Sequence, residues 1–225
     1  EALGLQLHEA AVGQLTLDNF SPTYNPNGSI GLVFDGGSGG DSITGTANND
    51  IIRGNGGNDT IDAGLGADSV TGDDDNDVIF GGGGDDTLLG GLGNDSFDGG
   101  DGNDSIVADG NDTLDGGAGA DTLVGGIGYD QFFGGADNDL LDGTDGDAAG
   151  PGGTGSFFEG DGGNDTLLGG AGNDSMFGIS GDNSVDGAAG DDSISGGSGN
   201  NTLIGGSGND SFADASGVSQ YFGND

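Results

Sequence analysis

The stretch GGLGNDSFD at residues 90–98 recurs with small changes along most of the chain, as GGSGGDSIT at 36–44, GGAGADTLV at 116–124 and GGAGNDSMF at 169–177. From residue 36 to residue 222 the sequence divides into 21 consecutive units, 19 of nine residues and two of eight. The two shorter units, 108–115 and 143–150, each lack one loop residue. Because this division leaves no residue for a linker, a fixed period of nine is expected to set the architecture.

Each unit has two halves with different physical properties. The first half, GGxGxD, supplies glycines where the backbone turns tightly or takes a positive φ, followed by an aspartate close to the turn. The second half is a three-residue strand whose central residue, at position eight, is apolar in every unit from Ile43 to Tyr221, with Ala149 the smallest. Two units make one turn of a flattened helix, with strands stacked in parallel at roughly 4.8 Å per turn. The predicted fold is an all-β parallel β-roll, a two-sheet solenoid of about ten turns and roughly 50 Å.

The charge of the chain is the second decisive feature. It contains 40 acidic residues and a single basic residue, Arg53, which gives a formal net charge of -39. All of the acidic residues except Glu1, Glu9 and Glu159 are aspartates, whereas a surface selected for solubility mixes Asp with Glu and Lys. A chain so acidic and so poor in apolar residues stays disordered unless a cation neutralises the carboxylates.

Several functional classes are excluded or disfavoured by composition. Nucleic-acid binding and attachment to anionic membranes require a basic patch, and no apolar stretch is long enough for membrane insertion. The chain has no cysteine, so disulfides and thiolate metal sites are excluded. His8 is the only histidine, and nothing in the sequence places a nucleophile beside it. We therefore do not expect an enzyme, and we expect His8 and Arg53 to be solvated.

The units resemble the RTX, or haemolysin-type, calcium-binding nonapeptide repeat, whose consensus is GGxGxDxUx. The resemblance covers residues 36–222 and implies that each calcium ion lies between loops of successive turns, held by position-six carboxylates and loop carbonyls. It implies one edge of the roll with Asp41, Asp59, Asp77 and Asp95, and the other edge with Asp50, Asp68, Asp86 and Asp104. The further implied ligands are Asp112, Asp121, Asp130, Asp139, Asp165, Asp174, Asp192 and Asp210. The sequence departs from the pattern at Ser156, Asn183, Asn201 and Ser219 and in the two short units with Asp112 and Asp147.

The same residues favour calcium on chemical grounds. Hard oxygen ligands without a His or Cys cluster select Ca²⁺ over zinc or copper. About a dozen to eighteen ions, bringing roughly 24 to 36 positive charges, would bring the roll close to neutrality. We expect binding and folding to be one event, with an unfolded chain where calcium is scarce and a folded one at the cell surface or outside the cell.

The ends and the biological role leave alternatives open. Residues 1–35, with alternating leucines and turn signals, are expected to form a cap or docking strands, and residues 223–225 an incomplete terminal loop. One hypothesis is a structural protein of surfaces or filaments, in which the chain ends and an outward apolar row at Leu89, Val107 and Val124 support self-association. The other is a calcium-dependent export and folding tail of a larger secreted enzyme or toxin.

Overall fold

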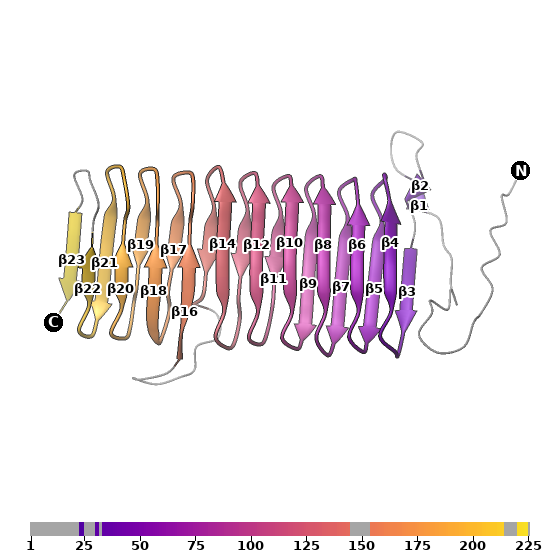
Figure 1. Cartoon of the computed structure of the whole chain (residues 1–225), viewed down its shortest axis with the longest axis horizontal. Helices are drawn as coiled ribbons and strands as arrows, with labels where there is room; N and C mark the ends of the chain where they lie inside the picture. The colour runs from indigo at the N-terminus through magenta and orange to yellow at the C-terminus, as the bar shows by residue number, and fades with distance from the viewer. Residues whose placement is uncertain (1–22, 25–29, 32, 145–153, 214–219, 225) are drawn as a thin grey trace, which may run out of the picture.

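The structure, a computed structural model, describes residues 23–24, 30–31, 33–144, 154–213 and 220–224. Consecutive strands alternate between two parallel sheets that lie face to face, and the turns between them form two long edges (Figure 1). The predicted all-β, two-sheet parallel roll of about ten turns is confirmed. The described part of the chain offers no helix long and apolar enough to cross a membrane.

One layer is a sheet of ten strands, in which all neighbours run parallel. Its strands in spatial order are β4 (Ser42–Thr46), β6 (Thr60–Gly64), β8 (Val78–Gly83), β10 (Ser96–Asp101), β12 (Thr113–Ala118), β14 (Gln131–Ala136), β16 (Thr154–Glu159), β18 (Asn173–Phe177), β20 (Ser193–Ser195) and β22 (Ser211–Ala213).

The other layer is a parallel sheet of eleven strands. Its strands in spatial order are β3 (Val33–Gly37), β5 (Ile51–Gly56), β7 (Ser69–Asp74), β9 (Thr87–Leu92), β11 (Ser105–Val107), β13 (Thr122–Val124), β15 (Leu140–Asp142), β17 (Thr166–Leu168), β19 (Ser184–Asp186), β21 (Thr202–Ser207) and β23 (Gln220–Asn224).

The core is a double row of the position-eight side chains, enclosed between the sheets. Alternation along each short strand sends the central side chain inward and its two neighbours outward. Ile52, Leu88 and Leu141 are fully buried, and Phe132 and Phe158 stack with their ring centroids 4.5 Å apart. The predicted inward position is therefore confirmed where the structure describes it, from Ile43 to Leu203.

Register between turns corrects one feature of the predicted repeat. Most paired residues are 18 apart, and the short unit 108–115 changes the spacing to 17, as in Phe97 beside Leu114. Across residues 143–150 the spacing is 26, as in Phe132 beside Phe158. The units on either side of 143–150 thus supply successive strands, one to each sheet, so this segment is an eight-residue insertion. The prediction that it forms a unit of its own was wrong; its Asp147 and Ala149 lie outside the described residues.

The roll begins slightly before the first predicted unit. Strand β3 already belongs to the eleven-stranded sheet, and Phe34 is a core residue paired with Ile52. Before it, β1 (Thr23–Tyr24) and β2 (Ile30–Gly31) form a small antiparallel pair. His8 and the alternating leucines of residues 1–22 lie outside the described residues.

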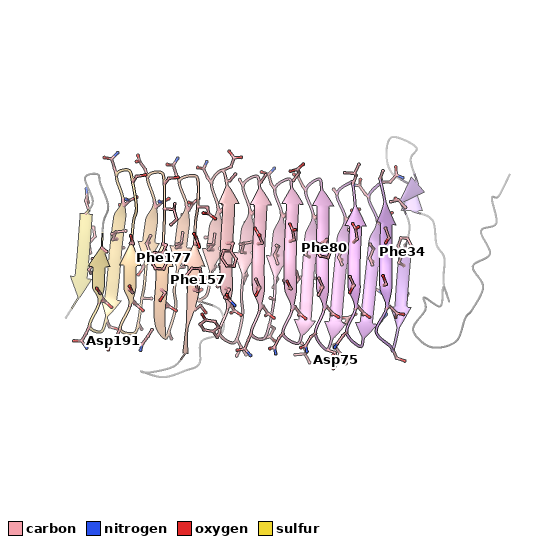
Figure 2. All side chains as sticks on the ribbon, in the orientation of Figure 1. Phe34, Asp75, Phe80, Phe157, Phe177 and Asp191 are labelled. Carbon is pink, nitrogen blue, oxygen red and sulfur yellow. The ribbon has the colours of Figure 1, made fainter. Side chains whose placement is uncertain are left out.

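The outer faces of the two sheets carry different apolar groups. On the ten-stranded sheet, Phe157 contacts both Phe133 and Phe177, with ring centroids 5.8 and 5.7 Å apart (Figure 2). On the eleven-stranded sheet, Leu89 and Val107 are neighbours and are 38% and 37% exposed. Neither group belongs to the core, because positions seven and nine point away from it.

Candidate metal-binding ladders

The position-six side chains form one ladder along each edge of the roll. Each carboxylate turns inward, and its Oδ1 accepts a hydrogen bond from the backbone N–H of the position-six residue one turn earlier. Asp68 N donates to Asp86 Oδ1 at 2.7 Å, and Asp86 N donates to Asp104 Oδ1 at 2.8 Å. The pattern survives the short unit, where Asp95 N donates to Asp112 Oδ1 at 2.6 Å. These bonds fix the spacing of the loops and leave Oδ2 as the oxygen that can take another partner at most positions; at Asp50 it already accepts from Thr46 N and Oγ1.

The structure places the position-six residues in two separate ladders, one along each edge. One ladder contains Asp41, Asp59, Asp77, Asp95, Asp112, Asp130, Ser156, Asp174, Asp192 and Asp210. The other contains Asp50, Asp68, Asp86, Asp104, Asp121, Asp139, Asp165, Asn183 and Asn201. All sixteen predicted ligands thus lie in the ladders, and all except Asp210 are buried. Ser219 lies outside the described residues.

In most of these aspartates the second carboxylate oxygen is buried and has no hydrogen-bond partner among the described residues. Burying a carboxylate oxygen in this state is costly, because its hydration is lost and nothing replaces it. The oxygens concerned include Oδ2 of Asp41, Asp59, Asp68, Asp77, Asp86, Asp95, Asp104, Asp112, Asp121, Asp139, Asp165 and Asp192. Because the same atom of one repeat position is unsatisfied turn after turn, these oxygens fit a cation as their partner.

In most units the first residue is a glycine, which leaves room beside this oxygen. A methyl group on Gly81 would lie 2.6 Å from Asp86 Oδ2 and 2.6 Å from the carbonyl oxygen of Gly99, one turn further on. Both oxygens therefore border the same small space. Two units carry alanine at this place, Ala63 and Ala108, and both methyl groups are buried.

The electrostatics of the ladders agree with a need for positive charge. Burial and the neighbouring aspartates of the same edge raise the carboxyl pKa, while the backbone N–H bond lowers it by less. The pKa rises from an ordinary 3.8 to about 7 at Asp77, Asp86, Asp112, Asp139 and Asp192. Burial raises the pKa of Asp68, Asp121 and Asp165 to about 6. At neutral pH the charged ladder opposes the fold unless a cation neutralises it.

Asn183 occupies position six in place of an aspartate and differs from it in one side-chain atom, Nδ2 instead of Oδ2. Asn183 Oδ1 accepts from Asp165 N at 2.8 Å, as an aspartate would. Its Nδ2 donates to the carbonyl oxygens of Gly178 at 3.0 Å and Gly196 at 3.2 Å. At Ser156 the hydroxyl oxygen accepts the bond from Asp130 N at 3.1 Å. Both residues keep the ladder continuous where the RTX-like pattern lapses.

A further row of stacked side chains, which the sequence analysis missed, follows the exposed tips of the turns outside the position-six ladders. Position-five side chains accept bonds from the backbone of the next turn: Asn94 N donates to Asn76 Oδ1 at 2.7 Å, and Asn209 N donates to Asp191 Oδ1 at 2.8 Å. Asp191 lies at the outer end of its turn, on the same edge as Asp75 (Figure 2). The Asn that stands directly before the position-six Asp in many units was the signal that could have found this row.

The donor set is distributed rather than clustered. Among the described residues there is no group of three or more acidic, histidine or cysteine side chains arranged to hold a metal. Each candidate site instead combines one carboxylate oxygen with main-chain carbonyls, all hard oxygen donors. Nothing in this arrangement resembles a nucleophile held by a general base.

Comparison with known families agrees with the geometry. The model of the RTX calcium-binding nonapeptide repeat matches residues 35–70, 71–106, 107–132, 115–147, 151–184 and 177–212. No curated protein matches the chain. Since the family model covers most of the sequence, the chain belongs to the family of RTX calcium-binding nonapeptide-repeat proteins.

Proposed function

We propose that this chain is a secreted calcium-binding structural protein whose roll folds as calcium binds. The observation that carries the proposal is the row of buried Oδ2 atoms along both edges, each without a hydrogen-bond partner among the described residues. The proposed ligands are the position-six aspartates together with carbonyl oxygens of the first glycines, such as Gly99 beside Asp86. The bound ion supplies positive charge between carboxylate and carbonyl oxygens.

The donor chemistry favours calcium over magnesium. Calcium accepts six to eight oxygens at about 2.3–2.6 Å in flexible geometry, whereas magnesium demands a tight octahedron and dehydrates reluctantly. Main-chain carbonyls fixed in a β-roll, with one carboxylate oxygen each, cannot contract around a small ion. The sites along both edges are therefore expected to discriminate against Mg²⁺.

Coupling of binding to folding follows from the charge. Without an ion, folding must bury many carboxylates of like charge, and the structure offers only one described cation, Arg53, which is exposed on β5. With ions in place, the buried Oδ2 atoms gain partners and the repulsion along each ladder falls. Extracellular modules use calcium sites of about 10⁻⁴ to 10⁻³ M, so a roll in this range folds outside the cell and not in a calcium-poor cytoplasm.

A calcium titration followed by far-UV circular dichroism tests the proposal. The chain is expected to be disordered in chelator and to gain β structure cooperatively as calcium rises, with magnesium as the matched control ion. A β spectrum that persists in excess chelator at neutral pH would refute coupled folding. Equal midpoints for calcium and magnesium would refute the assignment of the ion.

We further propose that the folded roll acts in surface or filament assembly. The supporting feature is the outward row Leu89, Val107 and Val124 on three neighbouring strands of the eleven-stranded sheet. Exposed apolar rows on a sheet are common protein-interaction surfaces. Light scattering and electron microscopy of the calcium-loaded protein test this: concentration-dependent assembly is expected, and Val107→Lys should abolish it. A monomer at all concentrations would refute it.

The alternative is a calcium-dependent export and folding tail of a larger secreted enzyme or toxin. The β-roll is a structural calcium-binding fold, so any catalysis would reside in a separate domain. The mass of the intact polypeptide distinguishes the two, because the tail hypothesis requires a catalytic domain on the same chain.

A further inference from the structure

We call each position-six side chain, together with the main-chain carbonyls beside it, a rung of its ladder. We propose that the ladders contain two kinds of rung: aspartate rungs, which need a calcium ion, and the asparagine rung of Asn183, which satisfies its carbonyls by hydrogen bonds without an ion. This inference rests on the proposed calcium-dependent folding and adds which position of the ladders does not take an ion. It follows from comparing the atoms at Asn183 with those at Asp86 on the same edge.

Asn183 satisfies its surroundings with its own amide. It is 2% exposed, and Nδ2 donates to Gly178 O at 3.0 Å and to Gly196 O at 3.2 Å. Gly178 is the first residue of the unit that contains Asn183, and Gly196 holds the same place one turn further on. The side-chain NH₂ group has two hydrogens, so these two carbonyls use both of them.

Asp86 occupies the equivalent place with the opposite polarity. Its unit begins at Gly81, and Gly99 holds that place one turn further on. A methyl group on Gly81 would lie 2.6 Å from both Asp86 Oδ2 and Gly99 O, and a methyl group on Gly178 would lie 2.8 Å from Gly196 O and close to Asn183 Nδ2. The two pockets therefore correspond atom for atom, with Oδ2 replacing Nδ2.

The exchange of NH₂ for an oxygen changes what each rung requires. A carboxylate is only an acceptor, so Asp86 Oδ2 shares its space with the carbonyl oxygen of Gly99 and has no hydrogen to donate to it. A divalent cation between them would turn this repulsion into ligand bonds. The amide brings its own positive end to the same carbonyls, and a cation placed beside it would meet the hydrogens of Nδ2. Asn183 therefore closes its rung and also excludes the ion.

The position of this rung gives the roll a segment with a lower calcium requirement. Asn183 N donates to Asn201 Oδ1 at 2.9 Å, so the two asparagines are consecutive on one edge, but Asn201 Nδ2 has no hydrogen-bond partner among the described residues. For Asn183, the carbonyl one turn further on is that of Gly196. The equivalent carbonyl for Asn201 belongs to residue 214, which lies outside the described residues. Strand β19, which follows the loop of Asn183, is expected to order at lower calcium than the strands of the first turns.

Two reciprocal substitutions test the inference in the full chain. Asp86→Asn should remove about one bound calcium ion without raising the calcium midpoint of folding, since the amide replaces the ion. Asn183→Asp should add about one ion and raise the midpoint. Asp86→Ala is the control that removes the ligand without supplying an amide, and its midpoint should rise. Equilibrium dialysis with calcium alone gives the ion count, and circular dichroism gives the midpoint.

The outcomes separate this inference from the proposed function. If the unsubstituted chain takes up no calcium, the proposed function fails. If it folds with calcium but Asn183→Asp binds no additional ion, or Asp86→Asn behaves like Asp86→Ala, only the two-rung assignment is overturned. If Asn183→Asp fails to fold at any calcium concentration, Asp86→Asn alone decides.

Discussion

Replacing a ladder side chain by alanine should have an effect that depends on calcium at Asp86 but not at Asn183. Asp86→Ala removes the acceptor of the hydrogen bond from Asp68 N, 2.7 Å long, and the buried Oδ2 that faces Gly99 O. Asn183→Ala removes the acceptor for Asp165 N and two bonds from Nδ2. Both variants lose local hydrogen bonds, but only the first loses a proposed calcium ligand.

The magnitude follows from the two contributions. An unsatisfied buried N–H costs about 1–3 kcal/mol at any calcium concentration. A site with a dissociation constant of about 1 mM stabilises the fold by about 0.4 kcal/mol at 1 mM calcium and about 1.4 kcal/mol at 10 mM. The free energy of unfolding lost in Asp86→Ala should therefore grow by about 1 kcal/mol between these concentrations, for each site lost. The loss in Asn183→Ala should stay constant.

Urea unfolding of the three proteins at 1 and 10 mM calcium measures these differences, provided that each transition is two-state. The decisive quantity is the gap, which is the difference in the free energy of unfolding between variant and unsubstituted protein, and how it changes with calcium. Damage to local packing is the same at both calcium concentrations, so it does not contribute to this change. A gap for Asp86→Ala that is independent of calcium would refute its role as a ligand. A gap for Asn183→Ala that widens equally would refute the distinction between the rungs.

Three further predictions concern the pH, the core and the loops. Because the pKa of Asp77 and Asp86 is about 7 in the fold against 3.8 ordinarily, the calcium-free roll should gain stability as pH falls from about 7 towards 4, where the fold binds more protons than the unfolded chain. Circular dichroism in chelator checks this, and a disordered spectrum that stays unchanged down to pH 4 would contradict it. Phe158→Ala should cost about 3–5 kcal/mol in urea unfolding with calcium, since the ring is fully buried; a loss below about 1 kcal/mol would argue against the stacked core. Gly84→Ala should destabilise the roll, because φ is 124° and the new methyl group would lie 2.5 Å from the Gly66 carbonyl carbon, whereas Gly56→Ala meets nothing within 4 Å and should be close to neutral; equal melting temperatures would contradict the turn geometry.

The sequence predicted much of the site because a short repeat fixes both its strands and its loops. An apolar residue at position eight, as in Ile52, has an inward direction once a three-residue strand forms, and an aspartate two residues earlier, as in Asp50, then lies at a sheet edge. The alternation of units between two sheets assigns Asp41 and Asp59 to one edge and Asp50 to the other. These relations are local, so they survive without knowledge of the neighbouring turns.

Pairing between turns decided what the local pattern left open. In the sequence, residues 143–150 fit the pattern of a short unit. The structure pairs Phe132 with Phe158, 26 residues apart, which shows that these residues are an insertion. An additional strand here would have moved every later core residue to the opposite sheet. Likewise, the sequence places Asp86 and Asn183 at one repeat position. Only the carbonyls of the next turn support the proposal that the first takes a cation, and only they show that the second donates two hydrogen bonds. Composition and period determine the roll, its edges and its demand for positive charge. The tertiary structure alone determines which turns are in register and which atom faces which, because those depend on contacts between residues a full turn apart.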